Sequence, residues 1–430
     1  MRIVITNTVS LNTGDAAILQ GIIKVLHRTF GKDIELFVFD SHHEIAGHLY
    51  KEFEFRSLIY NDLFAISASR YIRHIIRILN YLRFQLGIWL FKNKYYLICK
   101  IILPRTVFES LILYDDADLV ISTGGTYLVE NYSLRSRIFE LNIAIALNKP
   151  LMFFTQSAGP FRVKRNRESL KKIFNKSFLI LLRDAQSKNN LISIGVKKDN
   201  IYITADAAFA LADLSLVNKV KITTINLAEP SVAISVRYWR YFEKAGVDCG
   251  MINYKEAIKE SCIYIIDKYG AKVTFLSTCQ GIDEYWTDDS KIALEILNML
   301  PAKYRAAIKI DHSYHSPKQL MNEIIKHDFV ISTRLHMSIL SLNVGVPVLP
   351  IAYEFKTKEL FVRLGQEKYT YDIEELSGTE LIDAVDSFIG DININKAILF
   401  DKVESEIELV FSNSDLIKRK YDALKTTSLK

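Results

Sequence analysis

Short apolar runs alternate with longer amphipathic segments along most of this chain. The runs show no polar alternation, which is typical of strands buried on both faces of a parallel sheet. The segments between them repeat apolar residues every three or four positions, which predicts helices. The predicted strands are residues 2–6, 34–39, 119–122, 151–155, 179–182, 201–204, 232–236, 272–277, 308–310, 329–332 and 348–351. The predicted helices are residues 16–29, 133–147, 165–174, 185–194, 254–268, 291–299, 318–326 and 337–342.

This strand–helix alternation occurs in both halves of the chain, and the pattern lapses between residues 213 and 230. A chain of 430 residues is also too long for one ordinary core. We therefore expect an α/β fold of two Rossmann-like, doubly wound domains that face a cleft, covering residues 1–225 and 226–400. An amphipathic stretch within residues 401–430 predicts a C-terminal helix that packs back on the first domain.

Positive charge is concentrated in one part of the chain. The net charge is +6, yet the stretch from Leu63 to Phe108 holds eight Lys and Arg residues and no acidic residue. Charges interrupt its apolar runs every few positions, so a membrane-spanning helix is not expected. We predict a basic amphipathic helical insertion, residues 63–108, that either lies on an anionic membrane or packs its apolar face on the first domain. The membrane-facing candidates are Arg70, Arg73, Arg77, Arg83, Trp89, Lys92 and Lys94.

Three further observations narrow the class of protein. Bulky aliphatic residues among the charges, and the lack of a binding motif, argue against nucleic acid. The four Cys residues are scattered, with no CxxC pair and no His at ligand spacing, so neither a disulfide scaffold nor a metal site is expected. The first residues run directly into a strand pattern instead of a signal peptide. We expect a cytoplasmic protein, held on the inner face of the cytoplasmic membrane if the insertion contacts lipid.

The candidate chemistry lies where predicted strands end. Arg334 and His336 follow the strand at 329–332 and precede a helical pattern. Such a junction offers unpaired backbone N–H groups and the positive end of a helix dipole. A guanidinium and an imidazole there would bind an anion and move a proton. The alternative is a pair whose bonds are satisfied within the fold.

Two other strand ends carry related residues. Arg237 ends the first strand of the second predicted domain and would suit a carboxylate or phosphate, with Arg240 as the competing choice. Asn12 and Asp15 follow the first strand without a GxGxxG motif, so no dinucleotide site is indicated. They either line a polar pocket or belong to a loop that caps the next helix.

Polar and glycine-rich turns follow three more predicted strands. Gly124 and Gly125 would allow a ligand to approach the backbone closely. Gln156 and Ser157 can form hydrogen bonds with sugar hydroxyls, and Arg183 follows the next strand. For each turn, the alternative is ordinary loop structure.

Taken in order, these motifs resemble the polysaccharide pyruvyl transferase family. The ordered set is more specific than any single motif, and it extends over roughly residues 1–365. Two features depart from the family pattern, namely the basic insertion and Thr126, where a third glycine is often found. The matching elements are Asn12-x-Gly14-Asp15, Thr123-Gly124-Gly125, Lys149-Pro150, Gln156-Ser157-Ala158-Gly159-Pro160-Phe161, Arg183-Asp184-x-x-Ser187, Asp206-Ala207-Ala208-Phe209, Arg334-Leu335-His336 and Gly345-Val346-Pro347 with Tyr353 and Lys356.

The resemblance implies a GT-B-like architecture and the transfer of pyruvate from phosphoenolpyruvate to a sugar as a cyclic ketal, in making capsule or exopolysaccharide. Arg334, Leu335 and Arg237 are the expected donor-binding residues, because phosphoenolpyruvate carries two anionic groups. His336 is the expected general acid at the enol carbon, and Asp15 the expected base for the attacking hydroxyl. No cofactor or metal is expected, since arginines and helix N-termini can carry the charge. The expected acceptor-binding residues are Asn12, Gly124, Gly125, Gln156, Ser157 and Arg183.

The expected acceptor is a glycan linked to a polyprenyl diphosphate, which would account for the basic insertion. Two other classes stay open at this point. One is a GT-B glycosyltransferase that uses a nucleotide sugar, and the other is a non-catalytic protein of glycan assembly.

Overall fold

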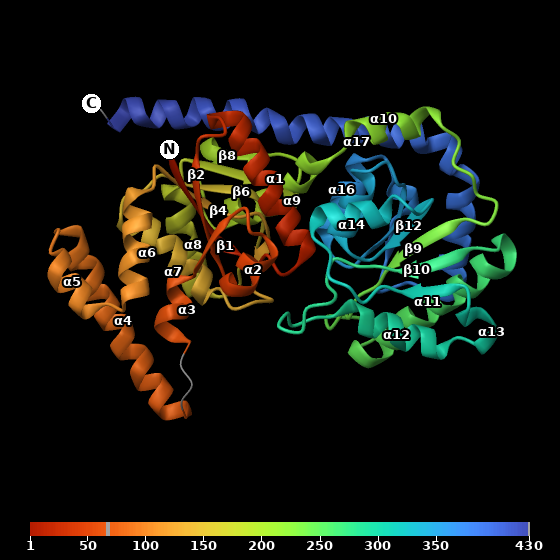
Figure 1. The fold of residues 1–430 in the computed structure, drawn as a ribbon, viewed down its shortest axis with the longest axis horizontal. Coiled ribbons are helices and arrows are strands. Elements are labelled where there is room, and N and C mark those ends of the chain that lie inside the picture. Colours follow the sequence, from red (N-terminus) through yellow and green to blue (C-terminus); the bar gives the residue numbers. More distant parts are fainter. Residues whose placement is uncertain (66–68, 429–430) are drawn as a thin grey trace. The chain divides into compact units, whose positions relative to one another are not determined.

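The chain divides into two compact units in the computed structural model, which describes residues 1–65 and 69–428. Unit 1 comprises Met1–Ser10, Ile22–Ala205 and Ser412–Lys430, and unit 2 comprises Leu11–Gly21 and Asp206–Phe411 (Figure 1). The segment Leu11–Gly21 therefore groups with unit 2, although it directly follows the first strand. The side chain of Arg70, one of the membrane-facing candidates, lies outside the described part of the chain.

Unit 1 contains an eight-stranded sheet in which the neighbouring strands are parallel. The strand order is β3-β2-β1-β4-β6-β7-β8, and β5 pairs with β6 beside this path. The strands are β1 (Arg2–Thr8), β2 (Glu35–Asp40), β3 (Glu54–Ser57), β4 (Leu119–Ser122), β5 (Gly125–Leu128), β6 (Leu151–Ala158), β7 (Leu179–Leu182) and β8 (Ile201–Ile203). The helices in this part of the chain are α1 (Thr13–Phe30), α2 (His43–Leu49), α3 (Ile59–Phe64), α4 (Arg70–Lys92), α5 (Tyr96–Ile102), α6 (Arg105–Asp116), α7 (Arg135–Ala146), α8 (Lys164–Lys176), α9 (Ala185–Ser193) and η1 (Lys198–Asn200).

Unit 2 contains a six-stranded parallel sheet of order β11-β10-β9-β12-β13-β14. Its strands are β9 (Ser231–Ser235), β10 (Lys272–Phe275), β11 (Ile308–Ile310), β12 (Phe329–Ser332), β13 (Val348–Ala352) and β14 (Tyr371–Asp372). The helices in this part of the chain are η2 (Ala207–Leu211), α10 (Leu214–Ile222), α11 (Val247–Tyr269), α12 (Asp289–Met299), α13 (Ala302–Arg305), α14 (Pro317–Ile324), α15 (Leu335–Leu342), α16 (Phe355–Arg363), η3 (Glu367–Tyr369) and α17 (Gly378–Ser428).

Both sheets have the strand order of a doubly wound Rossmann fold. In each, the first strand of the unit lies between the second and the fourth. Unit 2 has the order 3-2-1-4-5-6, and in unit 1 the same 3-2-1-4 start is followed by β6, β7 and β8. The predicted α/β class with two Rossmann-like units is therefore confirmed. Ligands of such folds bind beyond the carboxyl ends of the strands where the order reverses, which is between β1 and β4 in unit 1 and between β9 and β12 in unit 2.

The unbroken apolar runs correspond to strands covered on both faces. All residues of β4, β6, β7, β12 and β13 are buried. Phe153 in β6 packs against Phe174 of α8 with ring centroids 4.3 Å apart. Helices over both faces leave no solvated face, so the strands have no need of polar alternation.

Several elements differ from the prediction. The strands β3, β5 and β14 were not predicted, because β3 and β14 are short, partly exposed edge strands and β5 begins within the glycine pair. Helix α10 occupies part of the predicted linker 213–230, where the carboxylate of Asp213 accepts hydrogen bonds from the N–H groups of Ser215 and Leu216. The C-terminal helix, predicted within 401–430, is the 51-residue α17, and its residues from Ser412 onward group with unit 1.

The basic insertion folds as helices. Phe84, Ile88, Phe91 and Leu103 of this region pack into the core of unit 1, so part of the apolar surface is used within the fold. Across residues 1–65 and 69–428, no helix has a stretch long and apolar enough to cross a membrane.

Candidate active site

Side chains from four adjacent strand ends lie along the carboxyl edge of the unit 2 sheet. Ser277 follows β10, Arg237 follows β9, Arg334 follows β12 and Tyr353 follows β13. The central two strands, β9 and β12, flank the point where the strand order reverses. The two arginines predicted to bind the donor therefore lie at the expected ligand position of a Rossmann fold.

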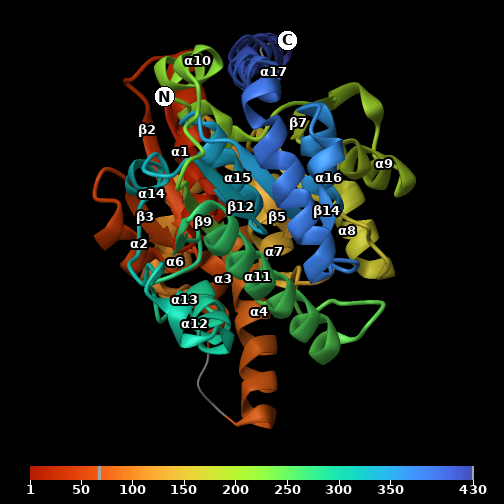
Figure 2. The same ribbon diagram turned by 90° about the vertical axis from the view of Figure 1, so that its right-hand side faces the viewer.

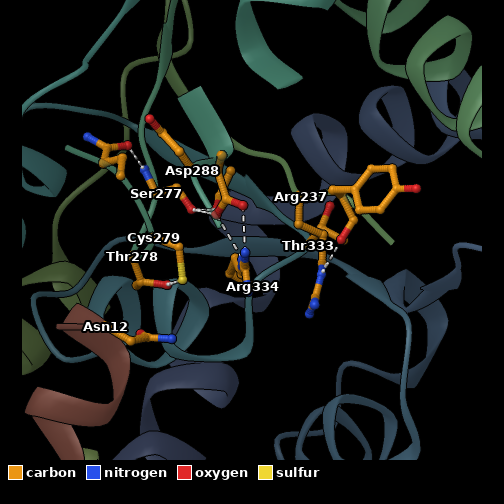
Figure 3. Close-up of polar contacts among 12 residues, drawn as sticks. Asn12, Arg237, Ser277, Thr278, Cys279, Asp288, Thr333 and Arg334 are labelled. Atoms are coloured by element: carbon orange, nitrogen blue, oxygen red, sulfur yellow. Dashed lines mark hydrogen bonds and ion pairs between the residues drawn. The ribbon is translucent and has the colours of Figure 1, made fainter. Parts of the chain in front are cut away.

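Arg334 is bound by a carboxylate of its own chain. Its Nε and Nη2 atoms donate to Asp289 Oδ2 and Oδ1 at 2.8 and 2.5 Å, and Asp289 is only 2% exposed. Ser277 donates to the same carboxylate, and dashed lines in Figure 3 mark these bonds. Burial alone would lower the pKa of Arg334, but the Asp289 charge raises it well above its ordinary value. The guanidinium is therefore charged, held rigidly and largely neutralised before a ligand binds.

Arg237 has a different environment. Its guanidinium carbon lies 3.9 Å from the centre of the Tyr353 ring and 4.9 Å from that of Trp239. Its Nε donates weakly to the carbonyl oxygen of Tyr238 at 3.4 Å, and no carboxylate of the described residues pairs with it. The residue is 6% exposed. A buried guanidinium held by two aromatic rings without a counter-charge is suited to an anionic ligand.

His336 lies in the first turn of α15, where two distant segments hold its ring. Its Nε2 atom is 3.5 Å from Oδ2 of Asp206, which precedes η2 and also accepts a hydrogen bond from the N–H of Ala208. On the other side lies Gly14, where an added Cβ would come within 2.6 Å of both the Cβ and the Nδ1 of His336. The imidazole is thus oriented by a carboxylate and packed directly on a glycine backbone.

The loop before α1 is attached to unit 2. The Asn12 side chain caps α1 by accepting from the N–H of Gly14 at 2.8 Å, and it donates to Tyr285 Oη at 3.3 Å. The Thr13 N–H donates to the carbonyl of Thr278 at 3.0 Å. Asn12, Thr278 and Arg334 appear together in Figure 3. The structure therefore gives Asn12 the capping role and a contact with Tyr285, and its part in ligand binding stays a prediction.

Cys279 is a buried residue close to these charged side chains. Burial raises the pKa of its thiol to about 11, and the charges of Arg334, Asp289, Asp15 and Arg237 also act on it. Because the thiol stays neutral near pH 7, it is a poor nucleophile.

The predicted residues of unit 1 form a second group. Arg183 donates from Nε to Ser157 Oγ at 2.8 Å and from Nη2 to Thr126 Oγ1 at 2.6 Å. Ser157 in turn donates to Asp184 at 2.6 Å. Arg183 and Ser157 thus belong to a network that fixes the loop following β6 and β7.

Gln156 lies at the end of β6 and is fully buried. Its Nε2 donates to the carbonyl of Gly125 at 2.7 Å, but its Oε1 has no hydrogen-bond partner among the described residues. Gly124 is buried beside it in the preceding turn. This buried acceptor lacks a donor, which a ligand hydroxyl could supply.

Of the predicted site residues, unit 2 contains Asn12, Asp15, Arg237, Arg334, Leu335 and His336, and unit 1 contains Gly124, Gly125, Gln156, Ser157 and Arg183. Reasoning from the sequence missed Asp289 and Trp239, and assigned no role to Asp206. The adjacent pair Asp288-Asp289 offered a signal, because one carboxylate suffices to cap α12 and the second is left for Arg334.

Comparison with known families decides the identity. The sequence model described as polysaccharide pyruvyl transferase matches residues 12–354, most of the chain. The chain belongs to the polysaccharide pyruvyl transferase family. The resemblance inferred from the ordered motifs is confirmed, and the protein is an enzyme of this class.

Relatives of this pyruvyl transferase agree in fold and in length. It is 24% identical over 425 residues to the amylovoran biosynthesis protein AmsJ of Erwinia amylovora, covering 96% of this chain and 95% of that one. Among solved structures, Alr3699/HepE of Anabaena in complex with UDP superposes with a TM-score of 0.58 at 12% identity, over 98% of this chain and 100% of its own. UDP-GlcNAc 2-epimerase of Neisseria meningitidis gives 0.56 at 14% identity, over 98% and 99%. At these identities the likeness shows the fold alone.

Removing the Arg334 side chain from this pyruvyl transferase is expected to destabilise it. Arg334→Ala would leave the Asp289 carboxylate buried without its partner and lower the free energy of unfolding by about 3 to 5 kcal/mol. Urea denaturation followed by circular dichroism measures this loss. The double variant Arg334→Met, Asp289→Leu should lose less of the free energy of unfolding than Arg334→Ala does, since neither charge remains buried. Wild-type stability for Arg334→Ala would instead show that the pair contributes little to folding.

Gly14 offers a way to move His336 without replacing it. Gly14→Ala is expected to lower kcat for pyruvyl transfer by about 10- to 100-fold, because the new Cβ overlaps the imidazole and a displacement of about 1 Å can cost that much. Gly390→Ala is the matched control, since that glycine also lies in a helix and a Cβ there meets no atom within 4 Å. Equal kcat values for the two variants would contradict the assigned position of His336.

Proposed function

We propose that this enzyme transfers pyruvate from phosphoenolpyruvate to a sugar of a surface-polysaccharide precursor, forming a cyclic ketal and releasing phosphate. The observation that carries the proposal is Arg237, a buried guanidinium that lacks a carboxylate partner among the described residues. It follows β9, the strand next to β12, which leads to His336. A cation without a counter-ion beside an imidazole suits a donor that is anionic and must be protonated.

Arg237 is the proposed principal anchor of the donor. Phosphoenolpyruvate carries a carboxylate and a phosphate, and a planar guanidinium can bind either group through two parallel hydrogen bonds. The N-terminus of α15 supplies a second positive charge beside Arg237, namely the partial charge of the helix dipole. The side chain of Arg334 at the N-cap makes no capping hydrogen bond with the backbone N–H groups there. Arg334 remains a proposed donor residue together with Leu335, but only through the part of its guanidinium that Asp289 does not occupy.

The proposed reaction proceeds by protonation and addition. His336 donates a proton to the methylene carbon of the enol, which makes the adjacent carbon electrophilic. A sugar hydroxyl adds to that carbon while Asp15 takes its proton, and the C–O bond to phosphate then breaks. A second hydroxyl of the same sugar adds to the same carbon and gives its proton to the now neutral His336, which closes the ketal ring and restores the acid. The sequence of steps consumes no redox equivalent, so the proposal includes no redox cofactor.

The proposed acceptor site uses the residues of unit 1. The unpaired Oε1 of Gln156 would accept a hydrogen bond from a sugar hydroxyl. Gly124 and Gly125 are buried but carry no side chain that would keep a ligand from the backbone, and the network of Ser157 and Arg183 holds the loop in place. A lipid-linked glycan is the proposed form of the acceptor.

One experiment separates this proposal from a nucleotide-sugar glycosyltransferase. The enzyme is incubated with phosphoenolpyruvate and a panel of methyl hexosides, and acceptor-dependent phosphate is measured. The expected product shows the methyl signal of a pyruvate ketal by NMR. Release of UDP from UDP-glucose, without phosphate release from phosphoenolpyruvate, would overturn the proposal. Binding of glycans without any turnover would favour a non-catalytic role.

A further inference from the structure

The first half of α4 has an unusual environment. From Tyr71 to Arg83 no residue is buried, although the helix continues into the core of unit 1 through Phe84, Ile88 and Phe91. Figures 1 and 2 both show this part of α4 extending away from the rest of unit 1. Helix α5 packs beside the second half of α4, where the Arg83 side chain donates to the carbonyl of Ile102. We name residues 71–102 the arm.

One apolar stripe runs along the exposed side of α4. Its six residues recur at intervals of three and four, so they lie on one face of the helix. Each is 49–59% exposed. Single exposed apolar side chains are common on protein surfaces, but a continuous row of six is not. Helix α5 adds exposed Leu97, Ile98 and Ile101. The stripe residues are Ile72, Ile75, Leu79, Leu82, Leu86 and Trp89.

The charge of this region points to the chemistry of its partner. Eight of the 55 Lys and Arg residues lie between Leu63 and Phe108, where there is no acidic residue. The remaining 47 are outnumbered by 49 acidic residues, so the rest of the chain carries a net charge of −2. The positive charge of the protein thus comes from this one region.

An open hollow on α4 gathers part of that charge. It is lined by Arg73, His74 and Arg77 of α4 and by Arg135 at the start of α7, with Tyr71 and Ile75 beside them. None of its lining residues is acidic. Guanidinium groups arranged in this way suit the phosphates of lipid headgroups.

We propose that the arm docks the enzyme on the surface of a bilayer that contains anionic phospholipids. The stripe enters the boundary between headgroups and acyl chains, and the basic residues along the arm contact lipid phosphates. Trp89 and Tyr95, whose rings stack 6.4 Å apart, suit the interfacial region. This proposal concerns docking alone and does not depend on the proposed reaction.

A second copy of the chain is a poorer occupant of the stripe. A symmetric interface would place the same patch of both copies together. Each copy would bring the six Lys and Arg residues of the arm and no acidic residue to that contact, and like charges there repel. An anionic lipid surface covers the same apolar area and also supplies the missing counter-charge.

A flotation assay tests the proposal by measuring how much full-length enzyme binds phosphatidylcholine vesicles with and without phosphatidylglycerol. Binding is expected only with phosphatidylglycerol. The variant Ile75→Ser, Leu79→Ser, Leu82→Ser should lose about 100-fold or more in affinity, because three exposed apolar side chains no longer enter the bilayer. The double variant Arg73→Gln, Arg77→Gln should lose affinity for these vesicles by roughly fivefold for each charge removed.

The matched control is Ile394→Ser with Ile398→Ser, which alters two side chains of α17 that are 73% and 60% exposed but lie off the arm. It should bind vesicles like the wild type. Three results would overturn the proposal: equal binding of all variants, equal binding to neutral vesicles, or a wild-type dimer that the stripe variant dissociates in sedimentation velocity. Because none of these assays uses a substrate, their failure would leave the proposed reaction untouched.

Discussion

Replacing Arg237 with Ala is expected to raise the KM for phosphoenolpyruvate by about 100- to 1,000-fold, with a smaller effect on kcat. The physical reason is that the bound anion would remain desolvated without its counter-charge. Arg237→Lys keeps the charge but loses the planar fork and its stacking on Tyr353 and Trp239, so about a tenfold rise is expected. Initial rates of phosphate release over a donor titration measure both effects.

Arg240 provides the control for this experiment. It lies three residues further along the chain, is exposed, and its guanidinium lies 5.0 Å from the ring centre of Tyr241. Arg240→Ala should leave the donor KM within a factor of two or so, as expected for a solvated cation. A large effect at Arg240 with none at Arg237 would reverse the assignment of the donor anchor.

Replacing His336 with Ala is expected to lower kcat by about 10²- to 10⁴-fold, the usual contribution of a positioned general acid. Donor binding should be largely retained, because the imidazole is assigned to proton transfer and Arg237 to anchoring. Single-turnover rates and isothermal titration with phosphoenolpyruvate separate the two quantities. A variant that loses donor affinity but keeps kcat would contradict the acid role.

Asp206 allows the orientation of the imidazole to be tested separately. Asp206→Asn keeps the shape of the side chain and can still cap η2, but it removes the carboxylate 3.5 Å from Nε2. A positioning role predicts a reduced kcat at an unchanged donor KM and unchanged stability. His74→Ala, on the exposed arm, should change neither parameter.

The pattern of apolar residues was sufficient to predict the class of fold. Strands β4, β7, β11 and β12 have the predicted bounds, because each is a short apolar run ended by polar residues. Edge strands gave weaker signals, since half of their residues face solvent. The grouping of Leu11–Gly21 with unit 2 could not be read from the sequence, because it depends on contacts such as that of Thr13 with Thr278.

The sequence was sufficient to predict which types of residue the candidate site contains, but not which other side chains each of them contacts. Arg334 and Arg237 both follow strands, and nothing in their local sequence distinguishes them. Their difference comes from Asp289, which lies 45 residues before Arg334 and meets it only in the folded chain. Trp239 and Tyr353 likewise reach Arg237 from separate segments. Charge balance in a buried site is a property of tertiary structure, so the sequence could propose two anchors without ranking them.

The way the chain passes between the two units constrains how the protein can be made. Unit 1 needs Ser412–Lys430 of α17, while unit 2 needs Leu11–Gly21. On a ribosome adding about 5 to 20 residues per second, roughly 10 to 40 s separate Ala205 from the arrival of Ser412. During that interval the first unit exists without its last helical turns. Fragments divided near residue 225 would leave both units incomplete, because the first would lack Ser412–Lys430 and the second would lack Leu11–Gly21.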